Sequence, residues 1–216
     1  MRLGFLCLLA ICLGSITVHA KIVPLNISSE ANATWCDVSG VGVMNCSTFP
    51  SGTQKYNGVS FNIPTINNAW FANTASNGGT GQVSITIPVN VANVRTVYTL
   101  INTFWGSTQS GLLSLTFQGS NGATFTYNPA GNTDIRDYNS GEFTTTIDCG
   151  LPSGAGKAAT VSAFNNGKGQ HLDMQIIELP VAFATQTLVR ITFIDSGAPN
   201  VQRSFLAAVT VSTALP

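Results

Sequence analysis

The chain has 216 residues, of which only 8% are charged, and its nine basic and nine acidic residues give a formal net charge of zero. An average soluble domain carries about 25% charged residues. Because the lysines and arginines are spread singly, no basic patch exists to attract phosphate groups, and we do not expect nucleic acid as a partner.

The N-terminus has the pattern of a secretory signal peptide. Arg2 provides a positive charge, residues 3–16 form an apolar run, and the small residues Val18 and Ala20 occupy the two cleavage-site positions. No later segment approaches the ~18 apolar residues of a membrane span. We therefore predict cleavage after Ala20, and a secreted, extracellular chain of residues 21–216 that does not span a membrane.

Three Asn-X-Ser/Thr sequons lie close together, at Asn26, Asn32 and Asn45. N-linked glycans are bulky, solubilising groups at the protein surface, which suits a chain with few charges. Their clustering favours real glycosylation sites, while accidental matches in an Asn-rich chain are the alternative.

The cysteines predict one disulfide. Cys7 and Cys12 belong to the signal peptide, and Cys36, Cys46 and Cys149 remain. An odd number in an oxidising compartment implies one disulfide and one free or intermolecular thiol. We favour the pair Cys36–Cys46, with Cys36–Cys149 as the competitor, and a covalent dimer through Cys149 stays open. Without a CxxC pair or a Cys/His cluster, zinc is not indicated.

The predicted secondary structure beyond residue 55 is a series of short strands. Residues 94–101 are apolar on both faces, as in a central strand, and the alternation in residues 172–179 changes phase at Ile176–Ile177, which suggests a bulge. Asn-Gly pairs predict turns, above all a type I′ hairpin turn at Asn121-Gly122. Apolar and polar residues alternate with period two in residues 83–87, 113–117, 123–127, 189–193 and 205–211.

These patterns predict an all-β chain folded as an antiparallel β-sandwich. We assign residues 1–20 to the signal peptide, residues 21–54 to an irregular N-terminal extension and residues 55–216 to the sandwich domain. No fixed-period repeat and no amphipathic helix of three turns is found.

Catalytic residues are not evident, and we expect a protein that is not an enzyme. His171 is the single histidine after the signal peptide, and its setting suggests a solvated loop residue rather than a general base. Glycoside hydrolysis by two carboxylates stays open as an alternative, since Asp134, Asp137, Glu142 and Asp148 are close in sequence. Their mixture with arginine is more typical of ion pairing in a loop.

A ligand-binding site is predicted where charge and aromatic residues concentrate between strands. Arg136, Asp137 and Tyr138 form one group, and Asn102 and Trp105 follow the central strand. Asp and Arg side chains hydrogen-bond vicinal hydroxyls, and aromatic rings stack on sugars. Trp70 lies in a second aromatic loop. For both tryptophans core packing is the alternative, and for Arg136 it is a loop-fixing ion pair.

Residues 56–64 (YNGVSFNIP), 97–106 (VYTLINTFWG) and 135–138 (IRDY) resemble secreted modules of the galactose-binding-like jelly-roll class, which includes carbohydrate-binding modules and discoidin-type lectins. The resemblance covers roughly residues 55–213. It implies a sandwich of eight or more strands, in many members with a structural calcium, that binds glycans through loops at one end. We therefore expect a lectin-like protein with a carbohydrate or glycoprotein ligand. An extracellular structural or cell-surface interaction protein is the alternative.

Overall fold

The alternating strands form the first layer of the protein. The computed structural model describes residues 20–34, 49–72, 81–139, 147–167, 169–197 and 202–216. Within them, a four-stranded antiparallel sheet has the order β5-β11-β7-β8. Its strands are β5 (Val83–Ala92), β11 (Thr187–Asp195), β7 (Leu113–Gly119) and β8 (Thr124–Tyr127). Their apolar residues turn inward and their Ser and Thr residues turn to solvent, so the period-two prediction is confirmed for residues 83–87, 113–117, 123–127 and 189–193.

The second layer is a six-stranded sheet with the order β1-β12-β6-β10-β9, in which β4 also pairs with β12. Every residue of β6, β10 and β12 is buried, because both faces of this sheet are covered. The central position predicted for residues 94–101 is thereby confirmed. The strands are β1 (Ile22–Pro24), β4 (Trp70–Phe71), β6 (Thr96–Phe104), β9 (Ala158–Asn165), β10 (His171–Glu178) and β12 (Arg203–Ser212).

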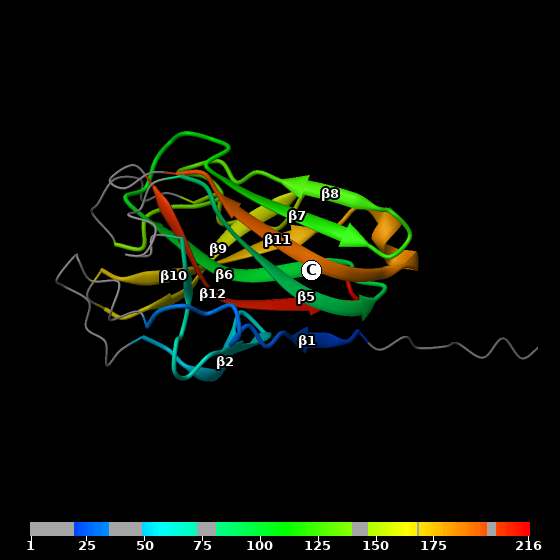
Figure 1. Cartoon of the computed structure of the whole chain (residues 1–216), viewed down its shortest axis with the longest axis horizontal. Coiled ribbons are helices and arrows are strands. Elements are labelled where there is room, and N and C mark those ends of the chain that lie inside the picture. Colours follow the sequence, from blue (N-terminus) through cyan, green and yellow to red (C-terminus); the bar gives the residue numbers. More distant parts are fainter. Residues whose placement is uncertain (1–19, 35–48, 73–80, 140–146, 168, 198–201) are drawn as a thin grey trace, which may run out of the picture.

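A two-stranded hairpin, β2 (Gly52–Tyr56) and β3 (Val59–Ile63), covers the outer face of the six-stranded sheet. Its turn residues Asn57 and Gly58 have φ of 47° and 85°, as a type I′ turn requires. In Figure 1, β1 and β2 lie at the bottom of the view, and β7 and β8 lie at the top. The chain is therefore a sandwich with an added layer on one side.

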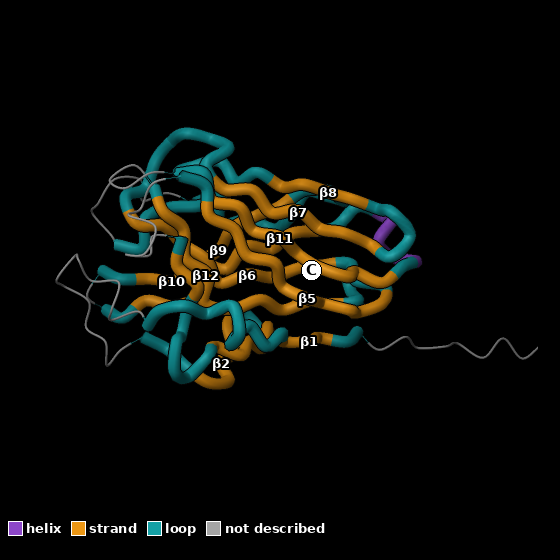
Figure 2. The backbone as a smooth tube through the Cα atoms, viewed as in Figure 1, coloured by secondary structure: helices purple, strands orange, loops and turns teal. Residues whose placement is uncertain are grey.

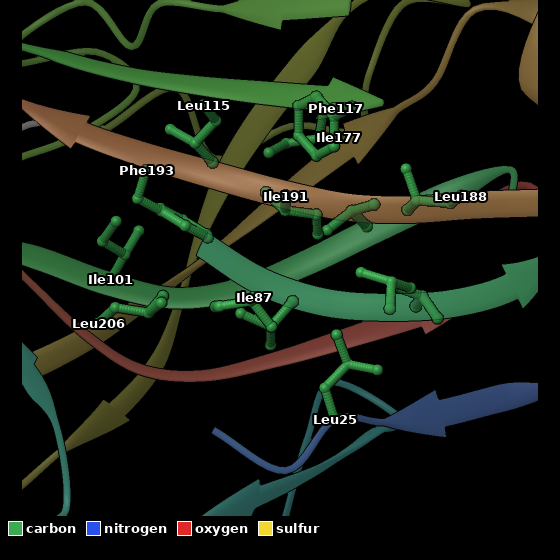
Figure 3. Packing of buried hydrophobic residues seen from close by; sticks show 14 of the residues in the cluster. Leu25, Ile87, Ile101, Leu115, Phe117, Ile177, Leu188, Ile191, Phe193 and Leu206 are labelled. Atoms are coloured by element: carbon green, nitrogen blue, oxygen red, sulfur yellow. The ribbon is translucent and has the colours of Figure 1, made fainter. Parts of the chain in front are cut away.

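Two apolar cores result. The inner core fills the space between the sheets, where Leu115 and Phe193 from one sheet meet Ile101 and Leu206 from the other (Figure 3). The outer core lies under the hairpin, where Phe61 packs with side chains of the six-stranded sheet. Each buried Phe, Leu or Ile contributes about 1.5–3 kcal/mol through loss of contact with water.

Four details differ from the sequence predictions. The alternation predicted for residues 205–211 is wrong, because every residue of β12 is buried. The register shift in β10 lies between Leu172 and Asp173, so the bulge predicted at Ile176–Ile177 is wrong. The hairpin β7–β8 is confirmed, but at its turn only Gly122 has positive φ, at 82°, so the predicted type I′ geometry is not adopted. Part of the N-terminal segment is regular, because β1 pairs with β12.

Helical structure is almost absent from the described residues: a short 3-10 helix, η3 (Val181–Thr185), stands among strands and loops (Figure 2). A search of these residues finds no helix with the length and apolarity to cross a membrane.

Several predicted features of the N-terminal region lie outside the described residues, namely the signal peptide up to residue 19, the sequon at Asn45 and the pair Cys36–Cys46. Asn26 is exposed, and its Oδ1 accepts a hydrogen bond from the main-chain N–H of Ser28 at 3.0 Å. Asn32 is held more firmly, since its amide donates to the carbonyl of Phe71 and accepts from the N–H of the same residue.

Candidate functional site

Two of the predicted site residues converge on a buried carboxylate that sequence reasoning missed, Asp173 of β10. Arg136 binds it through two hydrogen bonds, from Nε to Oδ2 at 2.7 Å and from Nη2 to Oδ1 at 2.8 Å. Asn102 donates from Nδ2 to Oδ2 at 2.7 Å and accepts from the main-chain N–H of Asp173 at 2.8 Å. The side chains of Arg136 and Asp173 are only 14% and 1% exposed. This is a charge-assisted, bidentate pair inside the protein.

The segment of Arg136, Asp137 and Tyr138 runs beside the end of β6, where Asp137 forms a parallel bridge with Thr103. Thr103 donates its N–H to the carbonyl of Arg136 at 3.0 Å, and its own carbonyl accepts from Tyr138 at 2.9 Å. Asp137 is buried, and its carboxylate accepts hydrogen bonds from the N–H groups of Gly106 at 3.1 Å and Asn139 at 2.7 Å. Asp137 therefore fixes the residue that directly follows Trp105.

The predicted aromatic residues differ in burial: Tyr138 and Trp70 are buried, whereas Trp105, which packs against the outer core beside Phe104, is half-buried. The Tyr138 ring lies 4.7 Å from the Phe104 ring in the outer core and is buried. Trp70 is 1% exposed and packs in the inner core, so no face of its indole meets solvent, and we remove it from the candidate ligand surface. Trp105 is half-buried at the end of β6, with a φ of 52° that is uncommon for a residue other than glycine.

The loop after Trp105 is exposed and polar, and it is held from two sides. Thr108, Gln109 and Ser110 are exposed. On one side Asp137 binds the N–H of Gly106. On the other, the loop passes so close to Gly131 that a Cβ there would lie 1.6 Å from the carbonyl oxygen of Ser107. We name residues 105–110 the Trp105 loop.

His171 is the second residue whose setting the sequence did not indicate. It is 2% exposed at the start of β10, so the prediction of a solvated loop histidine is wrong. Its Nε2 lies within hydrogen-bond distance of the main-chain carbonyl oxygen of Asp137, at 2.7 Å. Burial lowers the pKa of His171, and the carboxylate of Asp173, 3.9 Å from Nε2, opposes that shift. The contact of the ring with the Asp137 carbonyl joins the start of β10 to the segment that carries Asp137.

The lowered pKa of His171 predicts that stability falls in mild acid. The unfolded chain takes up a proton on this ring near pH 6.5, whereas the folded chain resists it, so the folded state loses stability as pH falls from about 6.5 toward the folded pKa. Urea unfolding at pH 7.5, 6.5 and 5.5 should show this loss, with a slope up to about 1.4 kcal/mol per pH unit. In His171→Gln the slope over this range should be smaller, and equal slopes in both proteins would contradict the assignment.

The other carboxylates of the predicted acidic group hold loops in place. Asp134 accepts from the N–H of Ala130 at 2.8 Å, and Asp148 accepts from the N–H of Thr160 at 2.6 Å. Glu142 lies outside the described residues. In the part of the chain that is described, no three His, Cys, Asp or Glu side chains gather in a way that could hold a metal ion.

The arrangement has the chemistry of a rigid binding surface. A buried, charged network of Arg136, Asn102, Asp173, Asp137 and His171 supports a loop that presents an indole and uncharged polar side chains. Comparison with protein-family models finds no match to this chain, and comparison with curated proteins finds none either.

Proposed function

We propose that this protein is a secreted, non-catalytic glycan-binding protein, and that the Trp105 loop is the surface that meets the sugar. The proposal includes membership of the galactose-binding-like jelly-roll class, a signal peptide that ends at Ala20, and glycosylation of the sequons. It rests on one observation above all, a half-buried indole in left-handed backbone conformation that packs at the margin of the outer core beside Phe104.

The chemistry of the loop suits a neutral sugar. An indole offers a flat apolar surface for the C–H face of a pyranose ring, and its N–H is a donor. The hydroxyl and amide groups of Thr108, Gln109 and Ser110 can exchange hydrogen bonds with sugar hydroxyls. None of these side chains carries a charge, so binding a neutral sugar removes no water from an ionic group of the loop.

The contacts that hold the Trp105 loop favour a binding surface that is formed before the ligand arrives. Unusual backbone conformations persist where the surroundings over-determine them, and such places are enriched in functional sites. Here the hydrogen bond from Gly106 to Asp137 and the close approach to Gly131 hold the Trp105 loop. A loop fixed before binding loses less conformational entropy when a ligand arrives. In this proposal Arg136, Asp137, Asn102 and Tyr138 position the loop, and Trp105 touches the sugar.

The experiment is a glycan array followed by titration of the best polysaccharide or oligosaccharide. We expect Trp105→Ala to weaken binding by about thirtyfold, which corresponds to the ~2 kcal/mol of a central contact residue. Ile66→Ala is the matched control, because Ile66 is an apolar residue exposed at 82% in another loop. Equal binding by wild type and Trp105→Ala, with circular dichroism showing both folded, would remove the Trp105 loop as the site.

A second candidate function is that of an extracellular structural protein that forms covalent dimers. The observation that favours it is the Cys149 thiol, which is exposed and unpaired within the described residues. Exposed thiols in an oxidising compartment form intermolecular disulfides readily. We expect a dimer band on a non-reducing gel that reductant and Cys149→Ser both abolish. A dimer that persists in Cys149→Ser would assign the link to another residue.

A further inference from the structure

The structure holds a pocket of about 390 Å³ on the outer face of the six-stranded sheet, away from the Trp105 loop. Its floor is formed by Val161 of β9 and by Met174 and Ile176 of β10. Tyr98 of β6, which pairs with Ile176, and Val59 of the hairpin also line it. Small-molecule sites have volumes of about 300–1,000 Å³ and mainly apolar linings. The pocket therefore has the size and the lining of a ligand site at the small end of this range.

The pocket arises from the way the hairpin covers the sheet. The hairpin packs over β12 through β3, and its turn reaches the edge strand β9. At that turn Asn57 donates from Nδ2 to the carbonyl of Ser162 in β9, at 3.1 Å. This contact joins the hairpin to the sheet edge and closes one side of the pocket. The cavity is thus bounded by fixed elements of the fold.

The described side chains that line the pocket include no carboxylate, lysine or arginine. Their polar groups are the amide of Asn57, the hydroxyls of Tyr98 and Ser162 and the thiol of Cys149, at the edges of an apolar floor. Burial raises the pKa of Tyr98, so this hydroxyl is neutral near pH 7. The charged group among the described lining residues is the main-chain carboxylate of Pro216, an exposed residue, so a charged ligand would lose its hydration without gaining a buried ionic partner. We propose that the pocket binds a small, uncharged, mainly apolar molecule whose polar end faces the rim.

The rim is built around Cys149. This residue has a φ of 54°, and its N–H donates to the carbonyl of Thr160 at 2.9 Å. The preceding Asp148 accepts from the N–H of Thr160 at 2.6 Å, so two hydrogen bonds fix the turn to β9. Leu151, exposed at 68%, also lines the pocket. An exposed leucine beside an apolar opening adds surface that a ligand would cover.

The position of Cys149 at the rim makes occupancy of the pocket measurable with a dye as the probe. N-phenyl-1-naphthylamine is an uncharged apolar dye whose fluorescence rises in apolar surroundings. We expect it to bind saturably at one site per chain. Bound dye should slow the alkylation of Cys149 by iodoacetamide at least threefold. Mass spectrometry of the peptide that carries Cys149 measures the alkylation rate. An unchanged alkylation rate at saturating dye would overturn the proposal.

Two substitutions at the pocket test its location. Val161→Trp fills the floor from an edge strand, where aromatic residues are favoured, and should weaken dye binding at least tenfold. Cys149→Trp blocks the rim from an exposed position and should have a similar effect if Val161→Trp does not fold. Ile66→Trp is the control and should bind as wild type does. Dye binding that both pocket variants leave unchanged, or that Ile66→Trp lowers equally, would show that the dye binds elsewhere and would overturn the proposal.

Discussion

Replacing Arg203 with methionine is expected to lower the free energy of unfolding by about 3–5 kcal/mol, since the change leaves a charge buried without its partner. Both Arg203 and Asp195 have fully buried side chains, and Nη1 of Arg203 donates to Oδ1 of Asp195 at 3.0 Å. Nη2 of Arg203 also donates to the carbonyl of Gly81 at 2.9 Å. Urea unfolding monitored by circular dichroism measures the loss.

The partner carboxylate does more than neutralise the arginine. Asp195 accepts from the N–H of Gly197 at 2.9 Å and from the N–H of Ser204 at 2.8 Å, so it joins the end of β11 to the start of β12. Because these two donors lose their acceptor as well, the double change Arg203→Met with Asp195→Leu should restore only part of the lost stability. Arg190→Met is the control, since Arg190 is exposed and should change stability by less than about 1 kcal/mol. A loss below that limit in Arg203→Met would contradict a buried ion pair.

The sequence predicted the strands of the four-stranded sheet well because that sheet has one face in solvent. In β7 the apolar Leu113, Leu115 and Phe117 face the core, and the polar residues between them face solvent. The same rule is weaker in β10, because Asp173 and Gln175 point into the protein and are as buried as Leu172. A hairpin that covers the second face of a sheet leaves no simple period in the sequence of the strands below it.

The candidate site was predicted in part, for a related reason. Sequence proximity grouped Arg136 with Asp134 and Asp137, and an ion pair within the loop was the alternative to ligand binding. The structure pairs Arg136 with Asp173 instead, 37 residues away. Arg136 lies beside the end of β6, and Asp173 lies on β10. The two side chains meet only because β6 and β10 are neighbours in the folded sheet. Trp105 could be placed at a strand end from its sequence, whereas the burial of Trp70 depends on the pairing of β4 with β12.

Asp173 itself is the residue at which the second large effect is expected. Asp173→Ala should lower the free energy of unfolding by about 3–5 kcal/mol, because Arg136 and Asn102 both lose a buried charged partner. The substitution also frees the segment that carries Asp137, so glycan binding through the Trp105 loop should weaken even at temperatures where the variant stays folded. Differential scanning calorimetry measures the first effect and glycan titration the second.

The matched control is Asp148→Ala, which removes an exposed carboxylate that also accepts a main-chain hydrogen bond, from Thr160. Asp148→Ala should lower the free energy of unfolding by about 1 kcal/mol, as for an ordinary hydrogen bond, and should leave glycan binding unchanged. A double-mutant cycle with Arg136→Met then isolates the coupling between Arg136 and Asp173. If Asp173→Ala lowers the free energy of unfolding no more than Asp148→Ala does, the buried network does not hold the Trp105 loop in a fixed conformation for sugar binding.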